Sequence, residues 1–388
     1  MENRFKKKKN IVFIDYSLLF VVLFLVGFGL VMIYSTSSYT AQLSHGDGAF
    51  YLKKQIFATV LGLVALVFVT FFDYHRLKKL AVFSIVVSAV MVLLVLTPLG
   101  ITANGARRWI NVGISIQPAE IAKIGVIIYE ASMIDKIGKK RLRGLTGFVY
   151  LFIVPLILAL MVFKITSNLS SAIIILGIAI VMWYVADPSS KGFVIAALAG
   201  VLLVVGVIFM AQKGMLGFRG ARIVAWLDPE SDATGVGFQT LQALYAIGSG
   251  GLLGKGIGQS MQKLGFVPEA QNDMIFSIIC EELGLFGALA IMALFIILIW
   301  RCMVIASNAR DLFGAMLVVG VMGHFAIQVI LNIAVVTNTI PNTGISLPFI
   351  SYGGTSALFL LAEIGLVLSV GRRIRFRDPN EKAGEGGV

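Results

Sequence analysis

Long runs of apolar residues, separated by short polar segments, divide almost the whole chain. Most runs measure about 17 to 25 residues, the length at which an α-helix crosses a bilayer core of roughly 30 Å. We predict an all-α, polytopic integral membrane protein with ten transmembrane helices. The predicted spans are residues 11–34, 55–72, 80–98, 118–134, 145–163, 170–187, 192–211, 272–300, 312–337 and 350–371.

One connection, residues 212–271 between the seventh and eighth spans, is far longer than the others. Loops of this length inside compact folds are either functional or disordered. The stretch FQTLQALYAI (238–247) has an amphipathic helical pattern. We therefore expect a structured loop rather than a disordered insertion.

The composition supports a single membrane domain over residues 1–388, with tails at 1–10 and 372–388. Hydrophobic residues make up 58% of the chain and charged residues 13%, against about 25% charged residues in a typical soluble domain. The two cysteines, Cys280 and Cys302, lie in or beside apolar runs and imply no disulfide framework. The three histidines are scattered without the spacing of a zinc site.

The net charge of +12 is spread over the segments that flank the membrane. Of the 32 lysines and arginines, 21 lie on the predicted side of the two termini and 10 on the other. Positive residues concentrate in cytoplasmic loops, so both termini are predicted to be cytoplasmic and the long loop extracytoplasmic. The basic tails would attract anionic lipid headgroups, and no nucleic-acid partner is expected.

The stretch GFVPEAQNDMIFSIICEELG (265–284) holds four of the 20 acidic residues: Glu269, Asp273, Glu281 and Glu282. Asn272 or Asp273 suits the N-cap of the eighth span. Asp273 and Glu281 are eight residues apart and would share a helix face, with Glu281 about 12 Å deeper in the membrane. The alternative to a cap is a carboxylate that acts on a lipid-anchored polar substrate at the outer boundary.

The stretch NGARRWINVGISIQPAEIAK (104–123) places Arg107 and Arg108 in a short outer loop. Arginine binds phosphate oxygens through two parallel donors. Pro118 suits the first turn of the fourth span. Glu120 and Lys123 are spaced to pair on one helix face, so they form either a structural ion pair or part of a site.

The stretch NTIPNTGISLPFISYGGTS (338–356) combines helix-breaking residues with hydroxyl side chains. Non-helical backbone at membrane depth is tolerated only inside protein or beside a wet cavity. We predict a re-entrant segment that lines a cavity, with an ordinary tight loop as the alternative. The Gly-rich stretch GSGGLLGKGIGQS (248–260) lacks the spacing of a phosphate-binding loop.

These three motif regions, together with GFQTLQALYAIGSGGLLGKGIGQSMQKL (237–264), resemble the SEDS family of bacterial cell-wall polymerases, and most closely its FtsW/SpoVE branch. The resemblance implies ten spans and a glycosyltransferase that polymerises lipid II outside the cytoplasmic membrane. It implies that Asp273, in VPEAQNDMIF, is the catalytic residue, and it carries family roles to Arg108 and Lys123. Where many members have an acid before the sixth span, this chain has Asn168, so no role of that acid is carried over.

In the expected mechanism Asp273 acts as general base on the acceptor hydroxyl, and cationic groups stabilise the departing pyrophosphate. The expected substrate-binding residues are Arg107, Arg108, Glu120, Lys123, Arg219, Arg222, Gln242, Lys263, Glu269 and Ser351. The expected supporting residues are Pro268, Glu281, Glu282 and Pro348. No metal site is expected from protein ligands alone, but Mg²⁺ or Mn²⁺ would accompany the pyrophosphate.

The resemblance also implies partners and a place in the cell. The partners are lipid II, a lipid-linked glycan strand, a class B penicillin-binding protein and other divisome proteins; the place is the bacterial cytoplasmic membrane at the septum, in division or sporulation. A lipid II flippase remains the alternative function, because charges inside the membrane also suit a transport path. A scaffold that only recruits division proteins is a third reading, and it would leave Asp273 and the arginines without a role.

Overall fold

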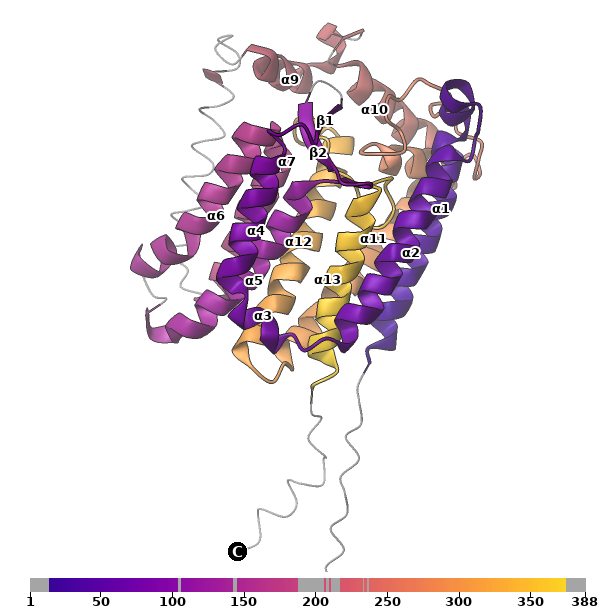
Figure 1. Cartoon of the computed structure of the whole chain (residues 1–388). Helices are drawn as coiled ribbons and strands as arrows, with labels where there is room; N and C mark the ends of the chain where they lie inside the picture. The colour runs from indigo at the N-terminus through magenta and orange to yellow at the C-terminus, as the bar shows by residue number, and fades with distance from the viewer. Residues whose placement is uncertain are drawn as a thin grey trace, which may run out of the picture.

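The computed structural model describes residues 14–103, 106–141, 145–187, 206, 209–210, 217–232, 234–235 and 237–374. Helices dominate this part of the chain, which confirms the mainly helical membrane architecture (Figure 1). The helices are α1 (Tyr16–His45), α2 (Phe50–Phe71), α3 (His75–Lys79), α4 (Ala81–Leu94), α5 (Pro118–Arg141), α6 (Leu145–Thr166), α7 (Leu169–Ala186), α9 (Gly217–Leu227), the 3-10 helix η1 (Pro229–Asp232), α10 (Phe238–Gly250), α11 (Ile275–Ser307), α12 (Leu312–Val336) and α13 (Thr355–Gly371).

Nine of the predicted spans correspond to one of these helices, and the predicted span 192–211 lies outside the described residues apart from three positions. By length and composition, five described helices suffice to cross a membrane: α1, α2, α7, α11 and α12. The count of ten therefore stays a prediction. Helix α5, which corresponds to the fourth predicted span, begins at Pro118, as predicted.

The outer surface of the bundle is apolar, as expected of a membrane protein, and α2 illustrates this. Phe57, Val64 and Phe68 are 58%, 62% and 69% exposed, whereas small and polar side chains such as Thr59 are buried. Gly62 lets α2 approach α13, since a Cβ at this position would lie 3.1 Å from the Leu358 Cα. Lipid removes the hydrophobic drive between helices, so small residues that allow close contact mark their interfaces.

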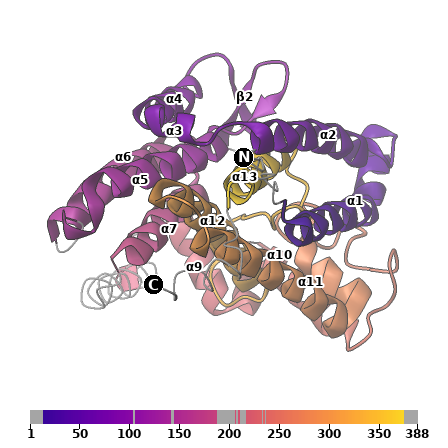
Figure 2. The ribbon, with the colours of Figure 1, turned by 90° about the horizontal axis from the view of Figure 1, so that it is seen from below.

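The two ends of the bundle differ. Figure 1 shows the sheet, α9 and α10 at one end and α3 at the other, and the view along the bundle shows the helices arranged around α13 (Figure 2). At the α3 end, Arg301 pairs with Asp15 just before α1, and Arg373 just after α13 pairs with Asp73. The described chain therefore starts and finishes at the same end of the bundle.

A small antiparallel sheet covers the opposite end, which the sequence did not predict. Its strands are β1 (Gly100–Ala103), β2 (Ala106–Asn111) and β3 (Ser115–Ile116), in the order β1-β2-β3. The turn between β2 and β3 uses Gly113 at φ +91°, whose N–H donates to the Asn111 side chain at 3.1 Å. The Arg107 guanidinium donates to the carbonyls of Leu96, Thr97 and Gly100, which fastens the sheet to the end of α4.

Helix α11 is broken at Gly284, which has φ 67° and ψ −167°. The glycine-rich loop after α10 supplies the hydrogen bonds that the break removes. The N–H groups of Lys255 and Gly256 donate to the carbonyls of Glu281 and Glu282, both at 2.9 Å. The N–H groups of Leu285 and Phe286 donate back to the carbonyls of Gly251 and Leu252. Residues 251–256 of this glycine-rich stretch therefore form a backbone splint that bridges the break in α11.

Candidate functional site

A cavity of about 470 Å³ opens between the sheet, the chain before α11 and the segment before α13. We call it the Asp273 pocket. It is lined by Ile101, Arg108, Trp109, Ser115, Gln117, Asn168, Glu269, Asn272, Asp273, Gly344, Ser346, Tyr352, Gly353, Gly354, Thr355 and Ser356. Four segments that lie far apart in the chain, including the sheet region and the 338–356 motif, thus meet at the Asp273 carboxylate.

Asp273 lies two residues before α11 and does not cap it. The N-cap is Met274, without a side-chain cap bond, so the predicted cap at Asn272 or Asp273 is wrong. The Asp273 Oδ1 atom is buried, and no donor among the described residues reaches it. The Asn332 side chain donates to the Asp273 backbone carbonyl at 2.8 Å, so the position of the residue is fixed while the Oδ1 atom of its carboxylate has no partner among the described residues.

The surroundings of Asp273 favour its protonated form. Burial raises the pKa of this carboxyl to about 6, and the charge of Glu269 contributes to the rise. A carboxylate with a pKa near the working pH suits general-base catalysis. The Asp273 carboxylate, whose Oδ1 atom has no partner among the described residues, is therefore the group of this site best suited to take a proton.

Glu269 stands on the rim of the Asp273 pocket in a left-handed backbone conformation, with φ 53°. This region is unfavourable for residues with a Cβ and costs about 1–3 kcal/mol. The Asn272 side chain donates to the Glu269 carboxylate. Strain held in place by its surroundings is typical of functional sites.

Arg108 is the cation of the pocket. Its Nη2 donates to the Ser167 carbonyl at 3.1 Å, and its Nε is buried without a partner among the described residues. Burial lowers the pKa of Arg108, and the positive charge of Arg222 lowers it further. A half-buried guanidinium without a carboxylate partner in the described chain favours an anionic ligand.

The segment 338–356 lines the cavity, as predicted. The Gln328 side chain donates to the Ser346 carbonyl at 2.9 Å and Asn332 to the Ile345 carbonyl at 2.7 Å. The Ser351 hydroxyl accepts from the Leu347 N–H at 2.7 Å, and Pro348 is buried in the same turn. Ser351 and Pro348 therefore shape the wall of the cavity rather than line it.

Several predicted binding residues do not line the Asp273 pocket and are bound to other residues instead. Lys123 and Glu120 are buried and paired at 2.8 Å, as their spacing predicts. Lys263 pairs with Glu282 at 2.8 Å, and Arg107 binds the carbonyls described above. Direct contacts of these residues with a substrate stay a prediction.

The other predicted residues lie in or near the long loop. Arg222 and Pro268 line a second cavity beside the Asp273 pocket. Gln242 is half-buried in α10 and is not among the residues that line the two cavities. Arg219 lies in α9, but its side chain lies outside the described part of the structure.

Other pocket residues were not predicted from the sequence. Trp109 and Gln117 follow the predicted arginines closely in the chain, but only the fold of the small sheet brings them to the cavity. Asn168 lines the pocket and caps α7, its side chain accepting from the Ser171 N–H at 3.0 Å. Its neighbour Ser167 has a left-handed backbone conformation, with φ 50°. Asn168, which stands where the resemblance implies an acid in many members, therefore lies at the site.

Within the described residues, no group of three or more His, Cys, Asp or Glu side chains is arranged to hold a metal ion. The carboxylates that line the Asp273 pocket are Glu269 and Asp273. A cation at this site would therefore need most of its oxygen ligands from a substrate.

Comparisons with known proteins cover nearly the whole chain. The FtsW/RodA/SpoVE family model, described as "Cell cycle protein", matches residues 16–375. Stage V sporulation protein E of Bacillus subtilis is 38% identical over 367 residues, which are 93% of this chain and 98% of that protein. The probable peptidoglycan glycosyltransferase FtsW of Trichlorobacter lovleyi is 38% identical over 359 residues, 92% of each chain.

Two solved structures share the fold. A chain from a study described as "Structural coordination of polymerization and crosslinking by a peptidoglycan synthase complex" is 26% identical with a TM-score of 0.78, and the match covers 94% of this chain and 99% of that one. The rod shape determining protein RodA of Thermus thermophilus is 26% identical with a TM-score of 0.64, covering 95% and 100%.

Proposed function

Because the chain belongs to the FtsW/RodA/SpoVE family, we propose that it is a peptidoglycan glycosyltransferase that polymerises lipid II at the outer face of the cytoplasmic membrane. The observation that carries the proposal is the Asp273 carboxylate, buried in a cavity without a hydrogen-bond partner for Oδ1 among the described residues. Relatives named as glycosyltransferases support the reaction class.

In this mechanism Asp273 removes the proton from the 4-hydroxyl of the acceptor sugar. The oxygen then attacks the anomeric carbon of the donor as the bond to the lipid pyrophosphate breaks, and the configuration at that carbon inverts. The pyrophosphate leaves with the bonding electron pair, and the proton remains on Asp273. Arg108, in the same cavity, would stabilise the negative charge that develops on the leaving group.

The proposal includes a divalent cation, Mg²⁺ or Mn²⁺, only as a companion of the substrate. The pyrophosphate oxygens would hold it, and Glu269, at the rim of the pocket, is the carboxylate that would complete its shell. The cation would supply further charge neutralisation for the leaving group.

The protein would work with a class B penicillin-binding protein that cross-links the strands, within the assembly of division proteins at the septum. A structural relative belongs to a synthase complex that joins polymerisation to crosslinking, which supports such a partner. We also propose that both termini are cytoplasmic, since the excess of lysine and arginine lies on their side.

The experiment compares the wild type, Asp273→Ala and Glu230→Ala, each reconstituted with its transpeptidase partner and fluorescent lipid II. Glu230 is an exposed acid of η1 and is the matched control. Glycan strands from the wild type and Glu230→Ala, but not from Asp273→Ala, are expected. Translocation of lipid II without strands from any variant would instead identify a flippase, and equal strands from all three would exclude Asp273 as the base.

A further inference from the structure

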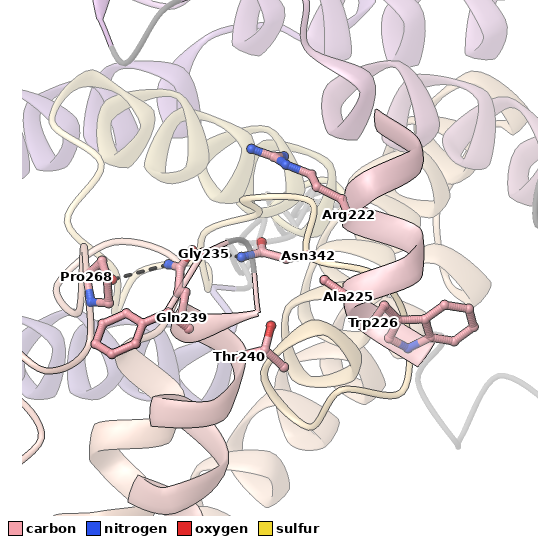
Figure 3. Close-up of a pocket in the computed structure, with 9 residues that line it drawn as sticks. Arg222, Ala225, Trp226, Gly235, Gln239, Thr240, Pro268 and Asn342 are labelled. Carbon is pink, nitrogen blue, oxygen red and sulfur yellow. Dashed lines mark hydrogen bonds between the residues drawn. The ribbon is translucent and has the colours of Figure 1, made fainter. Parts of the chain in front are cut away.

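A second cavity, of about 240 Å³, lies beside the Asp273 pocket (Figure 3). Figure 3 shows Arg222 and Ala225 of α9 on one wall and Gln239, Thr240 and Pro268 on the other, with Asn342 between them. We call it the α9–α10 cavity.

The two cavities share walls. Pro268 lines the α9–α10 cavity, and the next residue, Glu269, lines the Asp273 pocket. In the same way Asn342 lines the former and Gly344 the latter. The charge of Arg222 acts on both Asp273 and Arg108. A ligand that extends out of the Asp273 pocket at this edge would enter the α9–α10 cavity.

The polar groups of this cavity are held in place without a ligand. The Asn342 amide donates to the Gln239 side chain at 2.9 Å, and Gln239 donates to the Pro268 carbonyl at 3.2 Å. The Trp226 indole donates to the Asn338 carbonyl at 3.0 Å, and Asn338 donates back to the Trp226 carbonyl at 3.3 Å. Fixed side chains bind with a smaller entropic loss than mobile ones.

The chemistry of the lining suits a sugar. Trp226 and Phe238 provide aromatic surface for the C–H faces of a pyranose ring, whereas the amides and the Arg222 guanidinium provide partners for hydroxyl groups. The volume is below the roughly 300–1,000 Å³ of pockets that enclose a whole small-molecule ligand. The cavity therefore fits one segment of a longer ligand.

We propose that the α9–α10 cavity is an oligosaccharide subsite that holds a sugar unit of the growing strand beyond the reacting disaccharide, while the Asp273 pocket holds the reacting pair. This inference rests on the proposed function. A polymerase that grips the strand beyond the reacting sugar retains it between additions, so the subsite would set the length of the product more than the rate of a single bond formation.

The test fills the cavity without breaking its hydrogen bonds. Ala225 is 5% exposed and lines the α9–α10 cavity, so Ala225→Leu would occupy the sugar's place. The matched control is Val224→Leu, one residue earlier in α9, where the side chain is 42% exposed and is not part of the lining. Strand lengths from fluorescent lipid II and the initial rate of the first coupling are measured for both variants and the wild type.

Ala225→Leu is expected to shorten the strands about tenfold, the effect of losing roughly 1.4 kcal/mol of strand binding, with an initial rate within about twofold of the wild type. Binding of lipid-free glycan oligomers without turnover should weaken by a similar factor. Val224→Leu should match the wild type in both measurements.

Strands of wild-type length from Ala225→Leu would overturn the subsite. If Ala225→Leu fails to fold, Thr240→Val replaces it, because this change removes a lining hydroxyl without adding volume. A wild type that makes no strands would refute the proposed function itself, which is a different result from unchanged lengths.

Discussion

Asp273 and the adjacent glutamates Glu281 and Glu282 lie within ten residues of one another, yet the fold treats them in opposite ways. Glu282 is fully buried and receives bonds from Lys263 and Ser35, both at 2.8 Å. Glu281 is also fully buried and receives Lys255 at 2.7 Å, together with Ser249 and Ser260. For Asp273 Oδ1, by contrast, the described chain supplies no donor.

The difference shows that burial of a carboxylate does not by itself mark a catalytic group. The two glutamates tie residues 255–263 to α11 and α1, and this segment leads directly to Asp273. A buried charge with a complete set of partners organises its surroundings, whereas a carboxylate oxygen that lacks a partner and lines a cavity, as Asp273 Oδ1 does, can bind a substrate. The contrast supports the proposal that Asp273 carries out the chemistry while Glu281 and Glu282 position the segment that leads to it.

The strongest way to break this comparison is to neutralise each acid in turn. Asp273→Asn should lower the rate of strand synthesis about 10²–10⁴-fold, the usual contribution of a general base, while thermal stability is unchanged or raised. Glu282→Gln should instead lower the unfolding temperature. Lipid II turnover and thermal unfolding of both variants are measured, and a loss of stability in Asp273→Asn would contradict the assignment.

The second largest effect is expected on stability, when Lys263, the cation of the buried pair with Glu282, is removed. Lys263→Met leaves the Glu282 carboxylate without its charged partner, which typically costs about 3–5 kcal/mol. The double variant Lys263→Met/Glu282→Gln should recover most of that loss. Equal destabilisation of the single and double variants in denaturant unfolding would show that the pair does not act as a unit.

The pH dependence of the rate sharpens the comparison. The pKa of Asp273 is raised to about 6 by burial and by Glu269, and a base must be unprotonated, so the rate should rise about tenfold per pH unit up to roughly pH 6 and then level off. The fold binds this proton more tightly than the unfolded chain does, so the contribution of Asp273 to stability increases as pH falls through 6.

Glu269→Gln removes the second cause of the raised pKa and should shift the rising limb of the rate profile to lower pH. Steady-state rates measured between pH 4.5 and 8 check both expectations, because this range extends to both sides of the Asp273 pKa of about 6. A wild-type profile without a limb near pH 6 would separate the rate from the ionisation of Asp273.

The smallest effect is expected at Lys255. Its side chain is 35% exposed, and Glu281 would keep the Ser249 and Ser260 hydroxyls and the Met261 N–H after its loss. Lys255→Met should therefore destabilise the protein less than Lys263→Met in the same unfolding assay. The reverse order would place the main anchor of the loop at Glu281 rather than at Glu282.

Hydropathy alone predicted the helical architecture, because each helix that crosses lipid is a continuous run of apolar residues in the sequence. Local spacing predicted the Glu120–Lys123 pair, since both residues lie on one helix. The Lys263–Glu282–Ser35 cluster could not be predicted, because Ser35 and Glu282 are 247 residues apart and no pattern in either segment points to the other. The small sheet was also missed, because the six residues of β2 (ARRWIN) do not alternate strictly between apolar and polar side chains and β3 has only two residues.

At the site, the motifs and the family resemblance gave Asp273, Arg108 and Glu269, and the structure brings these three to one cavity. The resemblance also drew in Lys123, which is paired with Glu120. The α9–α10 cavity was not predicted, although Gln239, Pro268 and Asn342 lie in motif stretches, because no pattern in the chain indicates that its four separate segments meet.

The splint across the break in α11 has a consequence for how the protein is made. A Cβ at Gly284 would lie 2.4 Å from the Gly254 nitrogen, so the two backbones are in direct contact. Among the described residues, the donors to the carbonyls of Glu281 and Glu282 are the N–H groups of Lys255 and Gly256, in a loop that precedes α11 in the chain. In lipid, bare carbonyls are costly. During biosynthesis, the part of α11 around Gly284 can therefore reach its final conformation only after residues 251–256 have docked against it. The loop and this part of α11 therefore fold as one unit.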